Sequence, residues 1–210
     1  MITISPEQPE DAGAIEALLD LAFGAGRLAK ASYRYRHGVK PIAELCRVAR
    51  DGPGPNDEIV GAIRYWPVRI GRTGNPALLL GPLAVNPQRR GEGIGRTLVA
   101  QTLDWAMLAG HKLVVLVGDV DYYRQFGFHP ATPHGLAMPR EKTPERLQVR
   151  ELSPGALHGF KGNIGPWRSV RRRGVGSSAG RANKLAPASA ERQTLQPRDE
   201  ASVVVPMRKR

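Results

Sequence analysis

The order of a buried strand, a glycine-rich turn and a helix restricts the fold of this chain more than any other feature. Residues 77–85 form a continuous apolar run, which is typical of a strand buried on both faces. Gly81 and Pro82 interrupt the run, and such residues inside a strand indicate a bulge. A turn with glycines at 91, 93 and 95 follows, and an apolar helical pattern covers 93–109. The chain should therefore turn sharply from a core strand into a helix.

That turn is a candidate site for a diphosphate group. Backbone amides of a glycine-rich turn can point at one centre, and the helix dipole adds positive potential there. Arg90 and Arg96 flank the glycines and add positive charge. The segment is not a Walker loop, because no Gly-Lys-Ser/Thr follows, and it fits the dinucleotide fingerprint poorly. From the glycines alone, a purely structural turn remains an alternative.

The other segments fit around this unit as one mixed α/β domain. Asp11 can cap or begin the first helix, and Ile15, Leu18 and Leu19 recur along it at helical spacing. We expect strands at 2–4, 44–50, 59–70, 77–85 and 113–117 and from 127, and helices at 11–22, 93–109 and 119–126, with a weaker helical pattern at 28–38. This alternation predicts helices packed on one central sheet, an α/β fold of the α+β type within residues 1–160.

Positive charge is concentrated in residues 161–210. The chain has a net charge of +12, and this segment alone contributes +9. It is rich in Ser, Gly, Ala and Pro and poor in large apolar residues, so we predict a mostly disordered tail, about 170–202, with a short sticky end at 203–205. One interpretation is that the tail has no dedicated partner. The other is that it contacts an anionic partner weakly, in which case the protein would associate with nucleic acid or the ribosome.

Cysteine and histidine usage restricts the possible chemistry. Cys46 is the single cysteine, which excludes an intramolecular disulfide framework and a multi-cysteine zinc module. We interpret it as a small buried residue. The five histidines form no i, i+4 pair, so no metal site is expected. The sequence contains no apolar run of the ~18 residues that span a bilayer and no secretory signal, so we expect a cytoplasmic protein with no membrane partner.

Two motifs in the right order resemble the GNAT N-acetyltransferase superfamily. The first is the segment Arg90-Gly91-Glu92-Gly93-Ile94-Gly95, with Val85-x-Pro87 before it and Leu98 after it. It is similar to the family motif Arg/Gln-x-x-Gly-x-Gly/Ala. The second is Tyr123-Arg124-Gln125-Phe126-Gly127-Phe128, similar to the family's Tyr-x-x-x-Gly-Phe. The fuller Tyr-Tyr-x-x-Phe-Gly-Phe ending resembles a bacterial branch of predicted acetyltransferases. The resemblance covers about residues 1–160 and indicates the superfamily, not the substrate.

The resemblance implies a fold and a co-substrate. Acetyl-CoA would lie between two splayed parallel strands, 77–85 and 113–117, in a mixed sheet flanked by helices. Backbone amides near the end of the first strand would hold the pantetheine arm and polarise the thioester carbonyl, and the glycine turn would hold the pyrophosphate. The cofactor-binding residues implied in this way are Leu83, Ala84, Val85, Arg90, Gly91, Gly93, Ile94, Gly95 and Arg96.

The resemblance also implies direct transfer of the acetyl group to an amine. Tyr123 occupies the general-acid position, which would protonate the departing thiolate; a simple packing role remains an alternative. Asp119 is the best remaining candidate for a general base, because the strand 77–85 contains no carboxylate. It can equally cap the short helix that carries Tyr123.

The acceptor is an amine of unknown identity, either a small molecule or a protein. A cluster around His37, with Tyr33, Arg34, Tyr35 and Arg36, suggests an anionic or aromatic acceptor, but it fits a solvated helix face equally well. The other function left open is an acyl-CoA-binding module without turnover. Both a monomer and a homodimer are compatible with the sequence.

Overall fold

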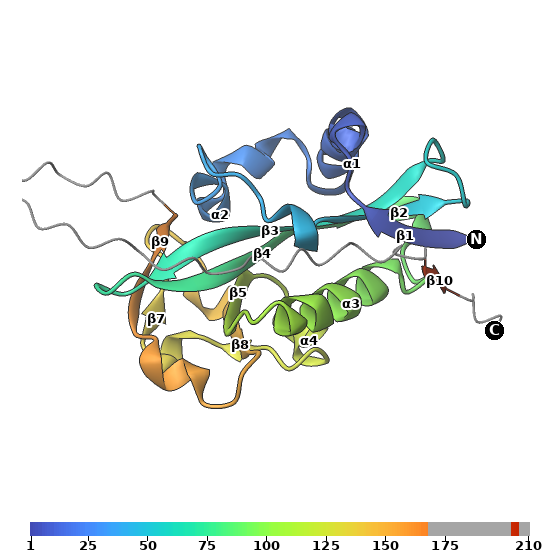
Figure 1. Cartoon of the computed structure of the whole chain (residues 1–210). Helices are drawn as coiled ribbons and strands as arrows, with labels where there is room; N and C mark the ends of the chain where they lie inside the picture. Colours follow the sequence, from blue (N-terminus) through green and yellow to red (C-terminus); the bar gives the residue numbers. More distant parts are fainter. Residues whose placement is uncertain (168–202, 206–210) are drawn as a thin grey trace, which may run out of the picture. The chain divides into compact units, whose positions relative to one another are not determined.

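The computed structural model describes residues 1–167 and 203–205, and these residues form one mixed sheet with helices on both faces (Figure 1). The strands are β1 Ile2–Pro6, β2 Arg47–Asp51, β3 Ile59–Ile70, β4 Asn75–Val85, β5 Leu113–Val117, β6 His129–Pro130, β7 Leu136–Ala137, β8 Leu147–Glu151, β9 Gly162–Pro166 and β10 Val203–Val205. The α-helices are α1 Ala12–Phe23, α2 Ala31–Arg34, α3 Ile94–Leu108 and α4 Val120–Arg124. Short 3-10 helices occupy Pro9–Asp11, Ala25–Ala29, Ala43–Leu45, Pro87–Arg89, Thr132–His134, Pro144–Arg146 and Ala156–Gly159.

The sheet is antiparallel except at two places. Its order is β10-β1-β2-β3-β4-β5-β8-β6, and β9 pairs with both β3 and β7. The β4–β5 and β7–β9 pairs are parallel. The parallel β4–β5 pair has α3 between its strands in the sequence, which is the crossover that parallel neighbours require. The predicted mixed sheet is therefore confirmed.

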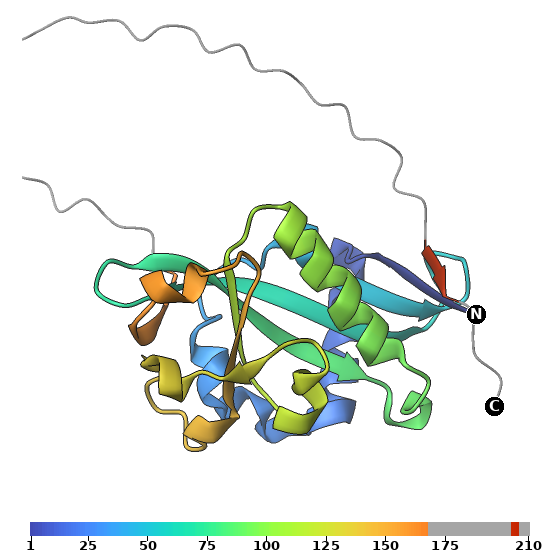
Figure 2. The ribbon, with the colours of Figure 1, turned by 90° about the horizontal axis from the view of Figure 1, so that it is seen from below.

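Helices cover the two faces of the sheet by burying one apolar stripe each. The α1 helix packs Ile15, Leu18 and Leu19 on one face, and α3 packs Leu98 and Leu103 on the other. Figures 1 and 2 show α1 and α2 on one side of β3 and β4, and α3 lying across the opposite side. Each helix repeats apolar residues at three- and four-residue spacing, so one stripe meets the core.

A glycine in β3 allows α3 to approach the sheet closely. A Cβ atom added to Gly61 would lie 2.8 Å from Ile94 Cγ2 and 3.1 Å from Leu98 Cδ1. A larger residue there would push the first turn of α3 away from the sheet. Since the glycine turn before α3 is fixed to this first turn, Gly61 helps to set the position of the turn relative to β4.

The sequence predicted the central elements well and the C-terminal strands poorly. The bounds of β3 and β5 are those predicted, 59–70 and 113–117. Strand β8 continues the sheet beyond β5, and β9 pairs with the end of β3; neither strand was predicted from the sequence. The predicted domain boundary at 160 precedes β9. Of the predicted tail, the part at 168–202 and 206–210 lies outside the described residues, and residues 203–205 pair with β1.

Candidate active site

The strands β4 and β5 pair over a short stretch and then separate. Their register joins Leu78 to Val114 and Leu79 to Val115, whereas β4 continues to Val85 and β5 to Val117. Beyond Leu79 the edge of β4 that faces β5 has no strand partner in the described part of the chain. Two parallel strands that separate in this way leave backbone N–H and C=O groups open to a ligand. The predicted V between splayed strands is thus present.

The separation begins where β4 bulges. Its register with β3 shifts between Ile63 and Tyr65, so that Gly81 and Pro82 together lie opposite Arg64. Gly81 has φ 121°, a conformation that favours glycine, and its peptide bond to Pro82 is cis. The bulge predicted at Gly81 and Pro82 is confirmed by this register shift. It bends the strand away from β5 at the head of the V.

The glycine-rich turn leads from β4 into the N-terminus of α3. Gly91 and Gly93 have φ of 89° and 82°, which a residue with a side chain adopts only with strain, and Gly93 is the N-cap of α3. Among the described residues, the N–H groups of residues 91–93 donate no hydrogen bond, and the first N–H groups of α3 have no acceptor within the helix. Arg90 and Arg96 are exposed and form no ion pair among the described residues. These donors and charges suit a diphosphate.

Gly95 has a different role from Gly91 and Gly93. A Cβ atom there would lie 2.9 Å from the hydroxyl oxygen of Tyr122 and 3.3 Å from Val85 Cγ2. The glycine therefore admits the Tyr122 hydroxyl against the first turn of α3. Tyr122 in this way links α4, which follows β5, to the glycine turn, which follows β4.

Tyr123 is half-buried on the α3 side of the sheet, beside the V. Its ring makes an edge contact with Tyr122, 5.0 Å between centroids, and another with Phe128, 5.7 Å. A Cβ atom on Gly118 would overlap Cε2 of Tyr123, so glycine at this position makes room for the ring. Burial, reinforced by Tyr122 and Asp119, raises the pKa of Tyr123 above its usual value. The phenol is therefore fully protonated at neutral pH.

The turn from β5 into α4 is held by two side chains at the start of β8 and just before it. Arg146 Nε and Gln148 Nε2 each lie 3.3 Å from the carbonyl oxygen of Gly118 and donate to it. At the same turn the carboxylate of Asp119 accepts the backbone N–H of Tyr122 at 2.7 Å and caps α4. Arg146 and Gln148 were not predicted from the sequence, because their position depends on β8, which was not predicted either.

The structure brings together most of the residues predicted from the sequence. Leu83 and Val85 pack beside the α3 core, and Ala84 points to the α1 side. The turn residues Arg90, Gly91, Gly93, Ile94, Gly95 and Arg96 lead from this strand into α3, although Ile94 is buried in the core and can offer only its backbone. Tyr123 lies in α4, which follows β5, the other strand of the V. Asp119 is exposed and has the capping role that the sequence allowed.

Two further properties of the described residues concern metals and membranes. No group of three or more His, Cys, Asp and Glu side chains is placed to hold a metal ion in residues 1–167 and 203–205. Within the same residues, every helix is too short or too polar to cross a bilayer.

Comparison with known proteins gives one family. The family model described as the acetyltransferase (GNAT) domain matches residues 43–130, from before β2 to β6. The sequence is 33% identical over 161 residues to the uncharacterized N-acetyltransferase YhbS of Escherichia coli strain K12. That alignment covers 77% of this chain and 93% of the relative.

Solved structures agree with the sequence comparison. A crystal structure of YhbS from Escherichia coli in complex with CoA matches with a TM-score of 0.66 at 32% identity, covering 78% of this chain and 88% of the other. A GNAT family acetyltransferase from Brucella melitensis, in complex with acetyl-CoA, matches with a TM-score of 0.57 at 26% identity, covering 79% and 95%.

Proposed function

Because this chain belongs to the GNAT family of N-acetyltransferases, we propose that it transfers the acetyl group of acetyl-CoA directly to an amine. The observation that carries the proposal is the separation of β4 and β5 after Leu79, next to unpaired amides at the start of α3. The two CoA-bound neighbours support acetyl-CoA as the co-substrate.

The residues around the V fit acetyl-CoA. The amides at Gly91 and Gly93 and the side chains of Arg90 and Arg96 would hold the pyrophosphate, which needs hydrogen-bond donors and positive charge. The open edge of β4 from Leu83 to Val85 would bind the pantetheine arm through its backbone. Acetyl-CoA supplies an activated acetyl group as a thioester, so the protein needs no nucleophile of its own.

Cys46, the single cysteine, is unsuited to be such a nucleophile. The residue is 2% exposed, and its thiol donates to the carbonyl oxygen of Ile42 at 3.2 Å. Burial raises its pKa to about 11, so the reactive thiolate is scarce at neutral pH. Direct transfer therefore fits this site better than an acetyl-enzyme on cysteine.

In direct transfer the neutral amine attacks the thioester carbonyl carbon. The C–N bond forms, the C–S bond breaks, the nitrogen loses a proton and the sulfur gains one. Holding both reactants in place lowers the barrier by proximity, and a β4 amide near Leu83 would stabilise the oxygen that becomes negative. Tyr123 would give its phenolic proton to the sulfur and recover it from solvent.

The base that takes the amine proton is less well defined. Asp119 is the carboxylate predicted for this role, but its hydrogen bond to the Tyr122 amide accounts for its position as a helix cap. We therefore propose that a base at Asp119 is dispensable and that water can remove the proton. Asp119→Asn, which can still cap α4, should retain most of the activity.

Two measurements on the full chain test the proposal. Acetyl-CoA and CoA should raise the melting temperature, because both bind the native state only. A panel of amines should then release free thiol from acetyl-CoA, with the acetylated amine identified by mass. The absence of stabilisation by either ligand contradicts the binding site, whereas stabilisation without thiol release would indicate an acyl-CoA-binding module.

A further inference from the structure

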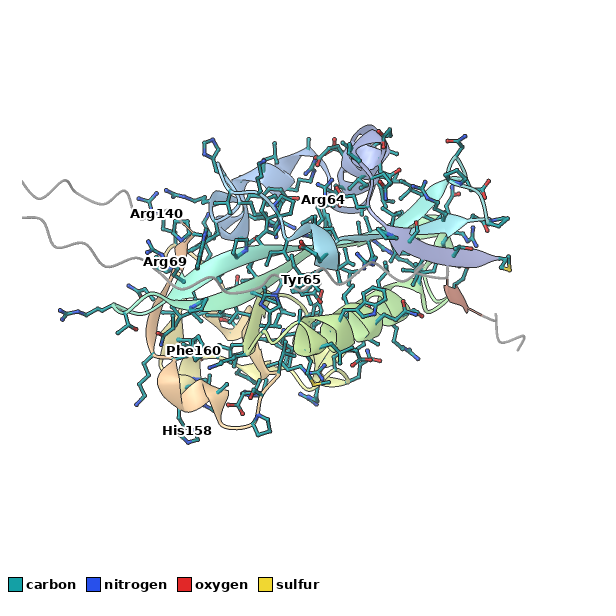
Figure 3. The ribbon with its side chains drawn as sticks, viewed as in Figure 1. Arg64, Tyr65, Arg69, Arg140, His158 and Phe160 are labelled. Atoms are coloured by element: carbon teal, nitrogen blue, oxygen red, sulfur yellow. The ribbon has the colours of Figure 1, made fainter. Side chains whose placement is uncertain are left out.

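The face of the sheet covered by α1 and α2 holds a network of arginines and carboxylates. Arg27 donates to Asp20 at 2.7 Å and to Glu16 at 2.6 Å. Arg64 donates twice to Glu7, at 2.8 and 2.7 Å, and once to Glu16, at 3.1 Å. Figure 3 shows Arg64 on this face and Tyr65, its neighbour on β3, on the α3 face. The carboxylates of this network are thus all engaged by Arg27 and Arg64.

Arg36, which follows α2, forms no ion pair with a carboxylate among the described residues. Its guanidinium lies over the ring of Tyr33, 4.4 Å from Cζ to the ring centroid. Arg27 fixes that ring, because its Nη1 donates to the Tyr33 hydroxyl at 3.1 Å. Nε and Nη1 of Arg36 are buried and have no hydrogen-bond partner in the part of the chain that the structure describes. Burial lowers the pKa of Arg36 to about 10, so the group is still a cation at neutral pH.

The guanidinium of Arg36 lies at the head of the V. Its Nη2 atom would be 3.2 Å from a Cβ atom placed on Gly81, the bulge residue at which β4 departs from β5. Trp66 lies two residues after Arg64 on β3 and so belongs to the same face. Its indole Nε1 is also buried and has no acceptor within residues 1–167. Buried donors without acceptors are costly, and a guanidinium especially so. Both would gain from a negatively charged ligand.

A pocket between the start of α2 and the end of β5 is also lined by positive charge. It has a volume of about 340 Å³ and is bounded by the start of α2, by Val117 at the end of β5 and by the segment 140–146. Its charged lining residues are Lys30, Arg140, Lys142 and Arg146, with Glu141 as the single carboxylate. One oxygen of Glu141 already accepts the backbone N–H of Thr143 at 3.1 Å. The side of the V next to α2 therefore attracts anions.

We propose that Arg36 binds an anionic group of the acceptor, a carboxylate or a phosphate, and that the acceptors are small amines that carry negative charge. An anion held by Arg36 at Gly81 places the rest of its molecule at the head of the V, where the acetyl group is transferred. The pocket at α2 adds long-range attraction. This inference rests on the proposed acetyl transfer and specifies its substrate class.

The test uses the full chain and amines in matched pairs. Amino acids and short peptides are compared with their C-terminal amides, and aminoalkyl phosphates with the corresponding amino alcohols. We expect the anionic member to have the higher kcat/KM. The amine of an amino acid amide is less basic than the amine of the free amino acid, so a larger fraction of it is in the reactive neutral form. The expected preference for the free amino acid is therefore opposite to the intrinsic reactivity of the two amines. The two sets of pairs distinguish carboxylate from phosphate.

Arg36→Gln should raise KM for the anionic amines by about 10- to 100-fold, the usual value of a hydrogen bond to a charged group. It should leave KM for the neutral amines and the affinity for acetyl-CoA unchanged. Arg34→Gln is the matched control, since Arg34 lies two residues away in α2 but is exposed. The Arg36 variant should melt no lower than the wild type, because it removes a buried charge that has no ionic partner.

The outcomes separate this inference from the proposed function. If acetyl-CoA does not bind, or no amine releases thiol, the proposed function fails. If thiol is released but the neutral members are equal or better substrates, or if none of the anionic amines reacts, the inference is wrong and the transferase activity stands. Equal effects of Arg36→Gln on anionic and neutral amines would also contradict it, since they indicate a structural role.

Discussion

At the scale of single residues, Tyr122 and Tyr123 share a type and a helix but differ in surroundings. The hydroxyl of Tyr122 lies against Gly95 at the glycine turn, and the ring of Tyr123 lies against Gly118 and Phe128. Burial raises the pKa of both phenols. The neighbouring tyrosine thus provides a control for the role proposed for Tyr123.

Tyr123→Phe should lower kcat by about 10- to 1000-fold, because general-acid catalysis usually contributes 10²–10⁴ and water can replace part of it. KM for acetyl-CoA should change little, since the ring remains and the pyrophosphate binds at the glycine turn. Tyr122→Phe should stay near the wild type. Steady-state kinetics with one good acceptor decide this. If Tyr122→Phe lost activity while Tyr123→Phe stayed active, the general acid would be Tyr122 and not Tyr123.

The pH dependence of the rate provides a second check on Tyr123. Its pKa lies above the usual phenol value of about 10, so the group keeps its proton up to at least that pH. The rate should therefore rise with pH as the acceptor amine loses its proton, without a fall below pH ~10 from loss of the acid. A decline that begins near neutral pH in the wild type, and is absent in Tyr123→Phe, would show that Tyr123 loses its proton there and would contradict its raised pKa.

Cys46→Ala should retain full transferase activity, because the buried thiol takes no part in direct transfer. Its removal should cost about 1 kcal/mol of unfolding free energy, typical of a small change in a core. Kinetics and denaturant unfolding measure the two effects separately. Rapid quenching of the wild type with labelled acetyl-CoA should show no acetylated protein, and an acetylated Cys46 would refute the direct mechanism.

At the scale of elements, the connections at the ends of β4 and β5 build the site. Each strand is followed by a turn that contains a critical glycine and then by a helix. After β4, the positive φ angles of Gly91 and Gly93 direct the chain into α3. After β5, Gly118 gives room to Tyr123, and its carbonyl is held by Arg146, just before β8, and by Gln148 of β8. In the proposed mechanism the first turn binds the cofactor and the second positions the proton donor.

Gly93→Ala should weaken acetyl-CoA binding and spare the chemical step. The space around Gly93 is open, but its φ of 82° costs a residue with a side chain about 1–2 kcal/mol. The turn should shift to relieve this strain, so that KM for acetyl-CoA rises up to about tenfold while kcat is kept. Gly13→Ala is the control, because Gly13 lies in α1, away from the site, with open space around it. A lowered kcat with unchanged KM would place Gly93 in the chemistry instead.

At the scale of the whole molecule, a buried ion pair ties the N-terminal segment to the sheet. Asp11 precedes α1 and Arg50 lies on β2, with 2.6 Å between Oδ1 and Nη2, and both residues are 6% exposed. Asp11 also accepts the backbone N–H of Gln8 at 2.9 Å. This pair fixes the start of α1 to β2. Through α1 it also helps to hold the α2 side of the site against the sheet.

Asp11→Ala should lower the free energy of unfolding by about 3–5 kcal/mol, because it leaves the charge of Arg50 buried and unpaired. Denaturant unfolding measures the loss. Asp121→Ala removes the acid of an exposed pair with Arg124, side chains 87% and 72% exposed, and should change stability very little. If the two substitutions lowered the free energy of unfolding equally, burial would not be what makes the Asp11–Arg50 pair important for stability.

The sequence by itself determined the central elements and the family. Apolar runs, turn glycines and helical spacing are local signals, so the segments 59–70, 77–85, 93–109 and 113–117 could be placed without coordinates. The bulge at Gly81 and Pro82 was predictable for the same reason, because both residues disturb a strand wherever it lies. The two motifs then indicated acetyl-CoA, Tyr123 and the glycine turn.

The tertiary structure decided which residues come together across the sheet. The strand at Leu147–Glu151 is short and alternates polar with apolar residues, and only pairing with β5 makes it part of the site. In the cluster around His37, sequence does not distinguish Arg34 from Arg36, because both are cations beside tyrosines. Only packing places Arg36 on Tyr33 and against Gly81, while Arg27 and Arg64 occupy the nearby carboxylates. Ion pairing and burial depend on contacts between distant segments, and these contacts do not follow from a local pattern.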